Sequence, residues 1–467
     1  MNRHLIVRSL LLASVMLCTD ASAQNGSETK GGNAEVSKLS DYRPIADKFI
    51  EAATCTDFAY KRLAELCDTF GPRFSGTTNL EAAVDWAQAH MKADGLENVH
   101  GEEVMVPHWV RGAESAELIE PTQQVLPMLG LGGSVATPQE GITAPVLVVR
   151  SFEELQQRAS EARGKIVLFN VPFVEYGQTV AYRVRGAAEA AKSGAVAALV
   201  RSITPFSLRL PHTGGMSYAD SATRIPCAAI TVEDAERLQR WQERGQQTMV
   251  RLKMSAKFLE DVRSHNVVAE ISGREKPDEI VLVSGHLDSW DVGQGAQDDG
   301  GGCLQAWEAL RLMHQAGLRP RRTVRLVLWV NEENGLAGAK NYAQRHRSEL
   351  AKHVLAIESD SGSFQPTGFT FKGSEPARTV VEQIGSLLQG IQANRIISGG
   401  AGSDVEQLAP SGVPVMELKV EASKYFWFHH TAADTVDKVN PKELGQCAAA
   451  MAVMAYVVAD RPEGLPR

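Results

Sequence analysis

The sequence lacks an excess of basic residues. It has 48 Lys and Arg against 56 Asp and Glu among 467 residues, which leaves a formal net charge of −8. A general nucleic-acid binder, or a protein that lies on an anionic membrane surface, needs a basic face. We therefore expect no nucleic acid and no membrane among its partners.

The sequence also lacks a long apolar run. Beyond the N-terminus, no segment approaches the eighteen or so uninterrupted apolar residues that a membrane-spanning helix requires. The N-terminus itself carries Arg3 and Arg8, the short apolar run "SLLLASVMLC" and then "ASA", which ends at Ala23. This pattern is typical of a secretory signal peptide. We predict cleavage after Ala23, with export to the periplasm or to the outside of the cell.

Cysteine is scarce and forms no motif. The six cysteines become five once the signal peptide is removed, and none of them stand close together in a pairing pattern. Cys55 and Cys67 would be the most plausible disulfide, but the stretch between them reads as a helix. A helix of that length separates its ends by about 18 Å, beyond the reach of a disulfide. We expect buried free thiols.

The chain is long for a single hydrophobic core, so two or three structural units are expected. Residues 24–40 are polar and predict a mobile leader. Residues 122–257 differ in pattern from the rest of the chain. They contain short strand-like runs with helical patterns between them, but no cluster of His, Cys or acidic residues. We interpret this segment as a small α/β insert, structural or covering a substrate, within a main unit of residues 41–121 and 258–467.

The C-terminal half of the main unit alternates between strand and helix. Its near-continuous apolar strand candidates are residues 280–284, 324–330, 354–357 and 413–418. Such strands, separated by helices, predict an α/β fold with a mostly parallel mixed sheet covered by helices on both faces. Ligands bind at the carboxyl ends of the strands in sheets of this kind.

Acidic and imidazole side chains follow these strands, at the predicted ligand-binding edge. They are His286 and Asp288, Glu332 and Glu333, and Asp360, together with Asp298 and Asp299 before the next helix and His429 and His430 later in the chain. Each has an ordinary explanation when taken alone: a helix cap, a solvated surface pair or a packed histidine. Crowded carboxylates, however, repel one another unless a cation holds them. His nitrogens and carboxylate oxygens without nearby cysteine suit zinc or a similar divalent ion.

Recognisable motifs also occur outside the predicted site. The sequence combines "HLD", "DD", "EE" and "HTAADT" with "GPRFSG", "RTVRLVLWVNEENG", "ESDSGSFQPTGF" and "YFWFHH". In this combination it resembles the zinc aminopeptidase family, whose catalytic sites hold two co-catalytic metals. The resemblance covers nearly the whole mature chain. It implies the zinc aminopeptidase fold, with residues 41–121 and 258–467 as the catalytic domain and residues 122–257 as a protease-associated insert domain.

The resemblance also implies a role for each site residue, and this sequence keeps the family pattern at all of these positions. His286 and Asp360 would hold one zinc, Glu333 and His430 the other, Asp298 would bridge the two, Glu332 would be the general base, and Asp288 would orient the imidazole of His286. His430 is preferred to His429 because the family's ligand directly precedes the threonine. A cis peptide bond between Asp298 and Asp299 is also expected.

The resemblance further implies hydrolysis of short peptides, chiefly dipeptides with free ends, two Zn²⁺ per chain, and a homodimer. Cobalt and manganese are also possible native metals, because such ligands discriminate poorly among them. Asp404 is a candidate partner for the substrate ammonium, with a helix cap as the alternative. Tyr425, Trp427 and Phe428 either wall the pocket or belong to the core. No lysine or arginine is identified for the substrate carboxylate.

Two other readings stay open. Glutaminyl cyclases share the fold but use one zinc and do not hydrolyse peptides, and other relatives of the fold are binding proteins with a dead site. The five-ligand set with a bridging Asp298 favours two metals, and the intact set argues against a dead site. Metal counting and a dipeptide activity panel would separate the three.

Overall fold

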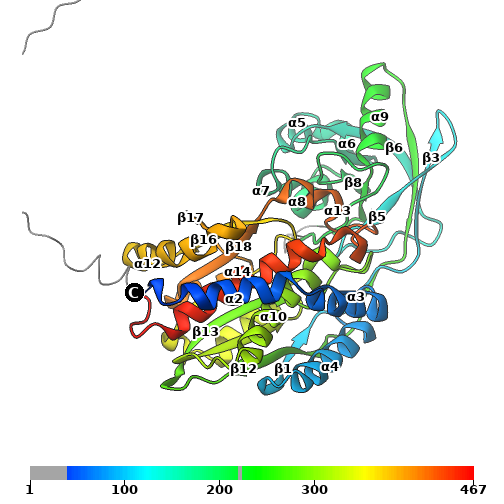
Figure 1. The fold of residues 1–467 in the computed structure, drawn as a ribbon. Coiled ribbons are helices and arrows are strands. Elements are labelled where there is room, and N and C mark those ends of the chain that lie inside the picture. The colour runs from blue at the N-terminus through cyan, green and yellow to red at the C-terminus, as the bar shows by residue number, and fades with distance from the viewer. Residues whose placement is uncertain (1–38, 219–222) are drawn as a thin grey trace, which may run out of the picture.

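The computed structural model describes residues 39–218 and 223–467. The predicted signal peptide and residues 24–38 of the predicted leader lie outside the described residues. Within the described ranges, no helix is both long and apolar enough to cross a membrane. Figure 1 shows two bodies of secondary structure, a larger one that carries both ends of the described chain and a smaller one projecting from it.

The larger body is built on an eight-stranded mixed sheet. Its strands, in spatial order, are β1 (Glu97–Val106), β12 (Val262–Ile271), β14 (Arg322–Trp329), β13 (Lys276–His286), β15 (His353–Glu358), β18 (Val415–Val420), β16 (Pro366–Lys372) and β17 (Arg395–Ser398). The four central strands β14, β13, β15 and β18 run parallel. These four are the apolar runs that the sequence predicts, so the expected mostly parallel mixed sheet is confirmed.

Both faces of the sheet are buried along β13, β14 and β15, which explains why these central strands are apolar without alternation. Along β13, Val281 and Val283 pack into one core while Ile280 and Leu282 pack into another. The first core is covered by α2 (Arg43–Thr54), α3 (Phe58–Phe70), α4 (Thr78–Ala93), α10 (Gly301–Gln315), α12 (Glu375–Gly385) and α14 (Pro441–Asp460). The second is covered by α11 (Ala337–Arg345) and the short helix η4 (Val405–Gln407).

The smaller body, here called the second sheet unit, spans residues 114–254. Its eight-stranded sheet has the order β4 (Gln124–Leu126), β3 (Glu114–Glu120), β10 (Met249–Met254), β6 (Ile142–Val149), β7 (Ile166–Phe169), β8 (Ala197–Arg201), β9 (Cys227–Ile230) and β5 (Met128–Gly130). Its helices are α5 (Phe152–Gln157), α6 (Ala159–Ala162), α7 (Tyr176–Thr179), α8 (Ala181–Lys192) and α9 (Val232–Glu243). Two hydrophobic cores of its own flank the sheet.

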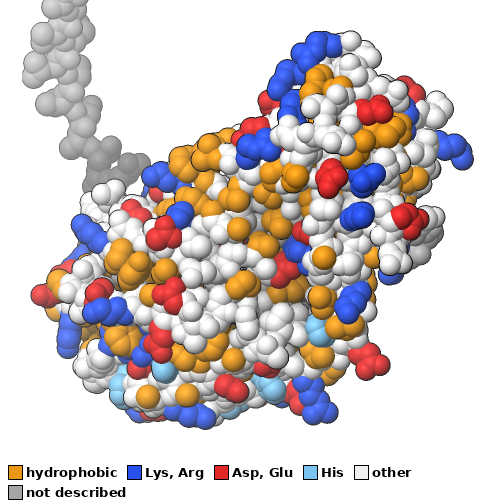
Figure 2. Space-filling view, turned by 90° about the vertical axis from the view of Figure 1, so that its right-hand side faces the viewer, with side chains coloured by type: hydrophobic (Ala, Val, Ile, Leu, Met, Phe, Trp, Pro, Cys, Tyr) orange, Lys and Arg blue, Asp and Glu red, His pale blue; other side chains and the backbone are white. Residues whose placement is uncertain are grey.

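This unit corresponds to the predicted α/β insert, although its strand pairing already begins with β3, before residue 122. Its assignment as a protease-associated domain stays a prediction. A two-stranded ribbon of β2 (Trp109–Val110) and β11 (Lys257–Phe258) lies at the two crossings between the units. In Figure 2 the smaller lobe projects from the larger one, and basic and acidic side chains are interspersed over the face in view.

All five cysteines of the described chain are free, as expected. Cys55 and Cys67 are separated by most of helix α3, which confirms the helical interpretation. The expectation of buried thiols holds for four of them but is wrong for Cys55, which is exposed directly after α2. Burial raises the pKa of the Cys67 and Cys227 thiols to about 12, so these thiols are unreactive.

Candidate metal centre

His286 is the last residue of the central strand β13 and is fully buried. Its Nε2 lies 3.3 Å from Asp298 Oδ1 and 3.4 Å from Asp360 Oδ1. Its Nδ1 lies 2.9 Å from the main-chain oxygen of Asp288, which can accept the Nδ1 proton. This hydrogen bond selects the tautomer that leaves the Nε2 lone pair free for a metal.

The Asp288 carboxylate lies elsewhere than the sequence reasoning places it. Its nearest oxygen is 3.8 Å from His286 Nδ1, so the carbonyl of Asp288, rather than its carboxylate, contacts the imidazole. The two carboxylate oxygens instead accept hydrogen bonds from the amides of Glu332, at 3.1 Å, and Glu333, at 3.3 Å. Asp288 therefore positions the segment that carries the two glutamates.

The two glutamates follow β14 on a tight turn. Asn331 has a φ of 66°, a left-handed conformation that asparagine adopts more readily than most residues. Its Oδ1 accepts from the amide of Ala337 at 3.1 Å, which closes the turn before α11. The turn brings Glu333 into contact with His430, and both Glu332 and Glu333 line the open pocket described below.

The second half of the cluster forms around His430. Its Nε2 lies 3.2 Å from Asp298 Oδ2 and 3.1 Å from Glu333 Oε2. Asp298 therefore directs one oxygen toward His286 and the other toward His430. The structure brings together all five ligands named from the sequence, in the two predicted groups around a shared aspartate.

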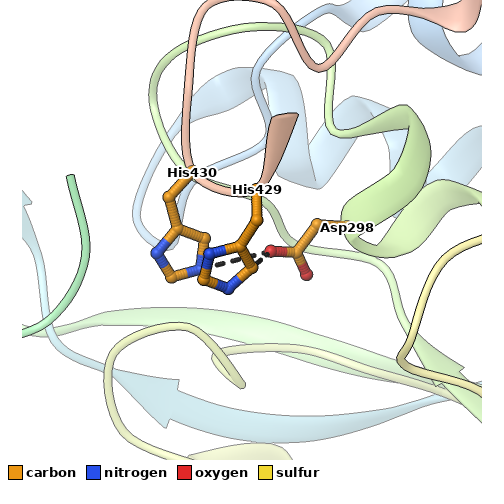
Figure 3. Close-up of side chains that lie close together, drawn as sticks. All are labelled: Asp298, His429 and His430. Atoms are coloured by element: carbon orange, nitrogen blue, oxygen red, sulfur yellow. Dashed lines mark ion pairs between the residues drawn. The ribbon is translucent and has the colours of Figure 1, made fainter. Parts of the chain in front are cut away.

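His429 lies against the same aspartate. Figure 3 shows the rings of His429 and His430 side by side, both facing Asp298. Their centroids are 3.5 Å apart, and His429 Nε2 is 3.6 Å from Asp298 Oδ2. His430 is the one of the two whose nitrogen also contacts Glu333, which supports the choice of His430 as the ligand.

Two further aspartates shape the loop that carries Asp298. Asp434 accepts from the amides of Gln297, at 2.7 Å, and of Asp298, at 3.1 Å. Asp299 accepts from the amide of His286 at 3.1 Å. The Asp298–Asp299 peptide bond is cis, which confirms the expectation from the sequence. Asp434 has no role predicted from the sequence, although the residue stands within the "HTAADT" stretch.

Arg73 is a second residue that the sequence reasoning missed. It is fully buried and donates to the carbonyls of Leu287, at 2.8 Å, Gln294, at 2.7 Å, and Gly295, at 3.0 Å. A buried guanidinium whose hydrogen bonds go to carbonyls fixes the path of the chain on which His286 and Asp298 lie. Its place in "GPRFSG" was the available signal.

The electrostatics of the cluster fit bound cations. Among the described residues, His286 Nε2, Asp298 Oδ2 and Glu333 Oε1 are buried and accept or donate no hydrogen bond, and His286 Nε2 and Asp298 Oδ2 have only ion-pair contacts within the cluster. Burial, and then the charge of Asp298, raise the pKa of the Glu333 carboxyl well above its ordinary value. Burial raises the pKa of Asp360 to about 7. Buried donor atoms of this kind, crowded together and short of partners, suit a divalent ion with nitrogen and oxygen ligands.

Several sets of donor atoms in the described chain lie within 4.8 Å of one another. They are His286 with Asp298 and Glu333, His286 with Asp299 and Asp360, and Asp298 with His429 and His430. The sets overlap at His286 and Asp298. The donor atoms therefore form one continuous cluster.

A pocket of about 1320 Å³ opens onto this cluster. Glu332, Asp360 and Tyr425 line it from the larger body, and Tyr176 and Arg183 line it from the second sheet unit. Tyr425 therefore walls the pocket, whereas Trp427 packs against Phe206. Asp404 is fully buried, and neither of its carboxylate oxygens has a hydrogen-bond partner among the described residues. Its side chain makes no cap bond to η4, so the helix-cap alternative is wrong, while its role toward a substrate ammonium stays a prediction.

Comparison with known proteins agrees with this geometry. Peptidase family M28 matches residues 266–455. Carboxypeptidase Q of Mus musculus is 50% identical over 433 residues, covering 92% of each chain. The crystal structure of a peptidase M28 precursor from Shewanella amazonensis superposes with a TM-score of 0.89 at 35% identity, covering 92% of this chain and 99% of that one.

A more distant structure has the same fold. The zinc aminopeptidase BSAP from Bacillus subtilis superposes with a TM-score of 0.67 at 19% identity, covering 87% of this chain and 95% of that one. The mixed sheet, the pocket at its carboxyl edge and the likeness to carboxypeptidase Q over nine-tenths of the chain lead to one conclusion. The chain belongs to peptidase family M28, among the relatives of carboxypeptidase Q, and is a metallo-exopeptidase.

Proposed function

We propose that this protein is a di-zinc exopeptidase that hydrolyses short peptides, chiefly dipeptides with free termini. His286 and Asp360 would hold one zinc, Glu333 and His430 the other, and Asp298 would bridge them. One observation supports the proposal most strongly: Asp298 Oδ1 faces His286 and Asp298 Oδ2 faces His430. A single-metal site would not need a carboxylate oxygen on both sides.

The bound ions would supply Lewis acidity, which lowers the pKa of a water molecule and polarises the scissile carbonyl. Glu332 would act as the general base. Its carboxylate would accept a proton from the attacking water and deliver it to the nitrogen of the leaving amine. Burial raises the pKa of Glu332, which favours a group that must take up a proton and release it again in each turnover.

Asp288 would position this base through the main chain. Because its carboxylate accepts from the amides of Glu332 and Glu333, it holds the base and a metal ligand in a fixed relation. Its carbonyl would also orient His286. The role inferred from the sequence, orientation of the imidazole, is thus assigned to a different atom of the same residue.

The walls of the pocket favour a small substrate with polar ends. Tyr176, Tyr425 and Phe426 supply aromatic surface, and Arg183 and Lys419 bring positive charge. Carboxypeptidase Q is the name of relatives that match this chain along its length, so a peptide with a free carboxyl end is a suitable probe. We further propose export, from the N-terminal pattern, and a homodimer, from the resemblance. Light scattering of the purified protein would test the dimer.

The central experiment is Glu332→Gln, which removes the proposed base and preserves the shape of the side chain. We expect two zinc ions per chain by elemental analysis and a kcat on dipeptides lowered by about 10²–10⁴-fold. Glu333→Gln is the matched control, since it should weaken zinc binding as well as activity. Loss of metal from Glu332→Gln would show that Glu332 is a ligand, and a wild-type protein that binds zinc but cleaves no dipeptide would refute the proposed activity.

A further inference from the structure

The backbone around the proposed ligand His430 is unusual. Helix α13 (Tyr425–Phe428) ends just before it, and His430 itself has a φ of 60°. This left-handed conformation is sparsely populated by residues other than glycine and asparagine. Such a conformation persists only where the surroundings impose it, so the contacts of this residue show what holds it.

Those contacts come from the second sheet unit, from His212 and Thr213, which we call the clamp. The amide of Thr213 donates to the His430 carbonyl at 3.0 Å. The Thr213 carbonyl lies 3.3 Å from His430 Nδ1, and His212 Nδ1 lies 2.8 Å from the His429 carbonyl. Three hydrogen bonds therefore join segments that are 217 residues apart in the chain.

The clamp is itself anchored within its own unit. The amide of His212 donates to Ser202 Oγ at 2.9 Å, and the Thr213 hydroxyl donates to the Gly130 carbonyl at 2.8 Å. Arg183 reaches the Thr213 carbonyl at 3.4 Å and the Gly215 carbonyl at 3.3 Å. His212 is only 2% exposed, so water cannot substitute for its bond to the His429 carbonyl.

The contact to Nδ1 bears on metal binding. Two groups face His430 Nδ1, the Thr213 carbonyl at 3.3 Å and Arg183 Nη1 at 3.5 Å. Because Trp290 donates to Nε2, the proton of a neutral ring lies on Nδ1, where the carbonyl can accept it and the guanidinium, a donor only, cannot. The Nε2 lone pair is then left facing Asp298 and Glu333. In the structure that nitrogen accepts from Trp290 Nε1 at 3.1 Å, a bond that a bound ion would replace. A fixed tautomer and ring orientation favour that replacement.

We propose that the second sheet unit positions His430, through the clamp, for binding one of the two metal ions. This ion, here called the second ion, is the one that His430 and Glu333 would hold. The inference rests on the proposed function, because it assumes an ion between His430, Glu333 and Asp298. It gives the unit a role beyond covering the substrate. His212 is a positioning residue in this scheme, since it touches the chain that carries the ligand and not the ion.

The test is the pair His212→Leu and His212→Asn. Leucine removes the donor, whereas the amide nitrogen of asparagine can stand where Nδ1 stands. Zinc is titrated calorimetrically into the metal-free protein, and Co²⁺ spectra are recorded for each occupancy. We expect His212→Leu to weaken the affinity for the second zinc ion by about tenfold or more and to leave the affinity for the first ion unchanged. His212→Asn should restore the affinity for the second ion.

Other outcomes overturn the inference. If His212→Leu binds both ions with wild-type affinity, His212 has no positioning role. If both variants lose affinity for both ions to the same extent, the effect is a general structural one and the inference is wrong. If His212→Leu does not fold, His212→Gln replaces it, since its longer side chain displaces the amide donor, and it should weaken only the second ion. A wild-type protein that binds fewer than two ions would refute the proposed di-zinc function itself, which separates that failure from failure of the clamp.

Discussion

At the scale of single residues, adjacent residues of the same type make different contacts in the site. Glu332 and Glu333 are adjacent and both line the pocket, yet Glu333 is the one whose carboxylate contacts His430. His429 and His430 are adjacent and stacked, yet His430 is the one that contacts Glu333. Side-chain chemistry is identical within each pair, so the assignment of ligand and base depends on backbone direction.

The histidine pair can be tested directly. We expect His430→Ala to lose one of the two zinc ions and to lower kcat by more than the about 10–100-fold typical of residues that only support a ligand. His429→Ala, the matched control, should keep two ions per chain, because its nitrogen contacts one carboxylate at 3.6 Å and lacks the contact to Glu333 that His430 makes. Elemental analysis of both purified variants checks this. The reverse result would make His429 the ligand.

At the scale of elements, close packing places the site. Helix α10 begins at Gly301, and the amide of Gly302 donates to Asp299 Oδ1 at 3.0 Å. A Cβ added to Gly302 would stand 2.0 Å from the Ser359 carbonyl oxygen and 2.4 Å from Asp299 Oδ1. The absence of a side chain at this position lets the helix approach the ligand-bearing edge of the sheet.

Gly302→Ala should therefore be destabilising. Because backbone and a buried carboxylate face the new methyl group, we expect a loss of about 1–3 kcal/mol in the free energy of unfolding. The control is Gly177→Ala in α7, where a Cβ would meet no atom within 4 Å and where alanine should stabilise by about 0.5–1 kcal/mol. Urea unfolding of the two variants checks the opposite signs. A neutral Gly302→Ala would contradict the tight approach of α10.

A largely buried side-chain pair joins strand β1 to the residue that follows helix α11. His346 Nε2 lies 2.7 Å from Glu102 Oε1, with both side chains largely buried. Burial opposes ionisation of both, yet their mutual hydrogen bond and charge raise the pKa of His346 and lower the pKa of Glu102. His100 and Glu349 also face this pair.

The sign of the pH dependence follows. The raised pKa of His346 contributes stability that is complete below its unfolded pKa and is lost as pH rises through its folded pKa. The lowered pKa of Glu102 contributes stability that is present above its unfolded pKa and is lost as pH falls through its folded pKa. A double-mutant cycle with Glu102→Gln and His346→Gln should give a coupling free energy of about 1 kcal/mol at pH values where Glu102 is ionised and His346 is protonated. The coupling should fall at lower pH, as Glu102 takes up a proton, and at higher pH, as His346 loses one. A coupling independent of pH would show that the pair is not ionic.

At the scale of the whole molecule, the proposed metal centre joins distant parts of the chain. Its ligands extend from His286 to His430, Arg73 fixes the loop from the N-terminal side, and the clamp reaches it from the second sheet unit. Binding two ions to such a centre should stabilise both bodies together. The free energy of unfolding is then linked to the metal concentration.

We expect chelation to lower the melting temperature and zinc to restore it. Free zinc at about a thousand times its dissociation constant should add about 4 kcal/mol per site to the free energy of unfolding. Glu332→Gln should respond to zinc like the wild type, whereas Asp298→Asn should respond weakly because the shared carboxylate is lost. Differential scanning calorimetry with and without a chelator measures this. An unchanged melting temperature would exclude a structural role for the ions.

The fold was largely readable from sequence because its signals are local. Four apolar runs indicated the central strands, and the polar residues just after them indicated the binding edge. The contributions of Arg73, Asp434 and the clamp were not readable, because each acts through hydrogen bonds to the main chain of a remote segment. A side chain that binds a remote carbonyl or amide leaves no pattern at its own position.

The sequence by itself determined which residue types stand at the carboxyl ends of the strands, since periodicity and strand order place them at one edge. The tertiary structure alone decided which oxygen of Asp298 faces which histidine, and which atom of Asp288 meets His286. It also decided that a different unit holds His430. These choices depend on backbone dihedral angles and on contacts across 217 residues, which composition and spacing do not encode.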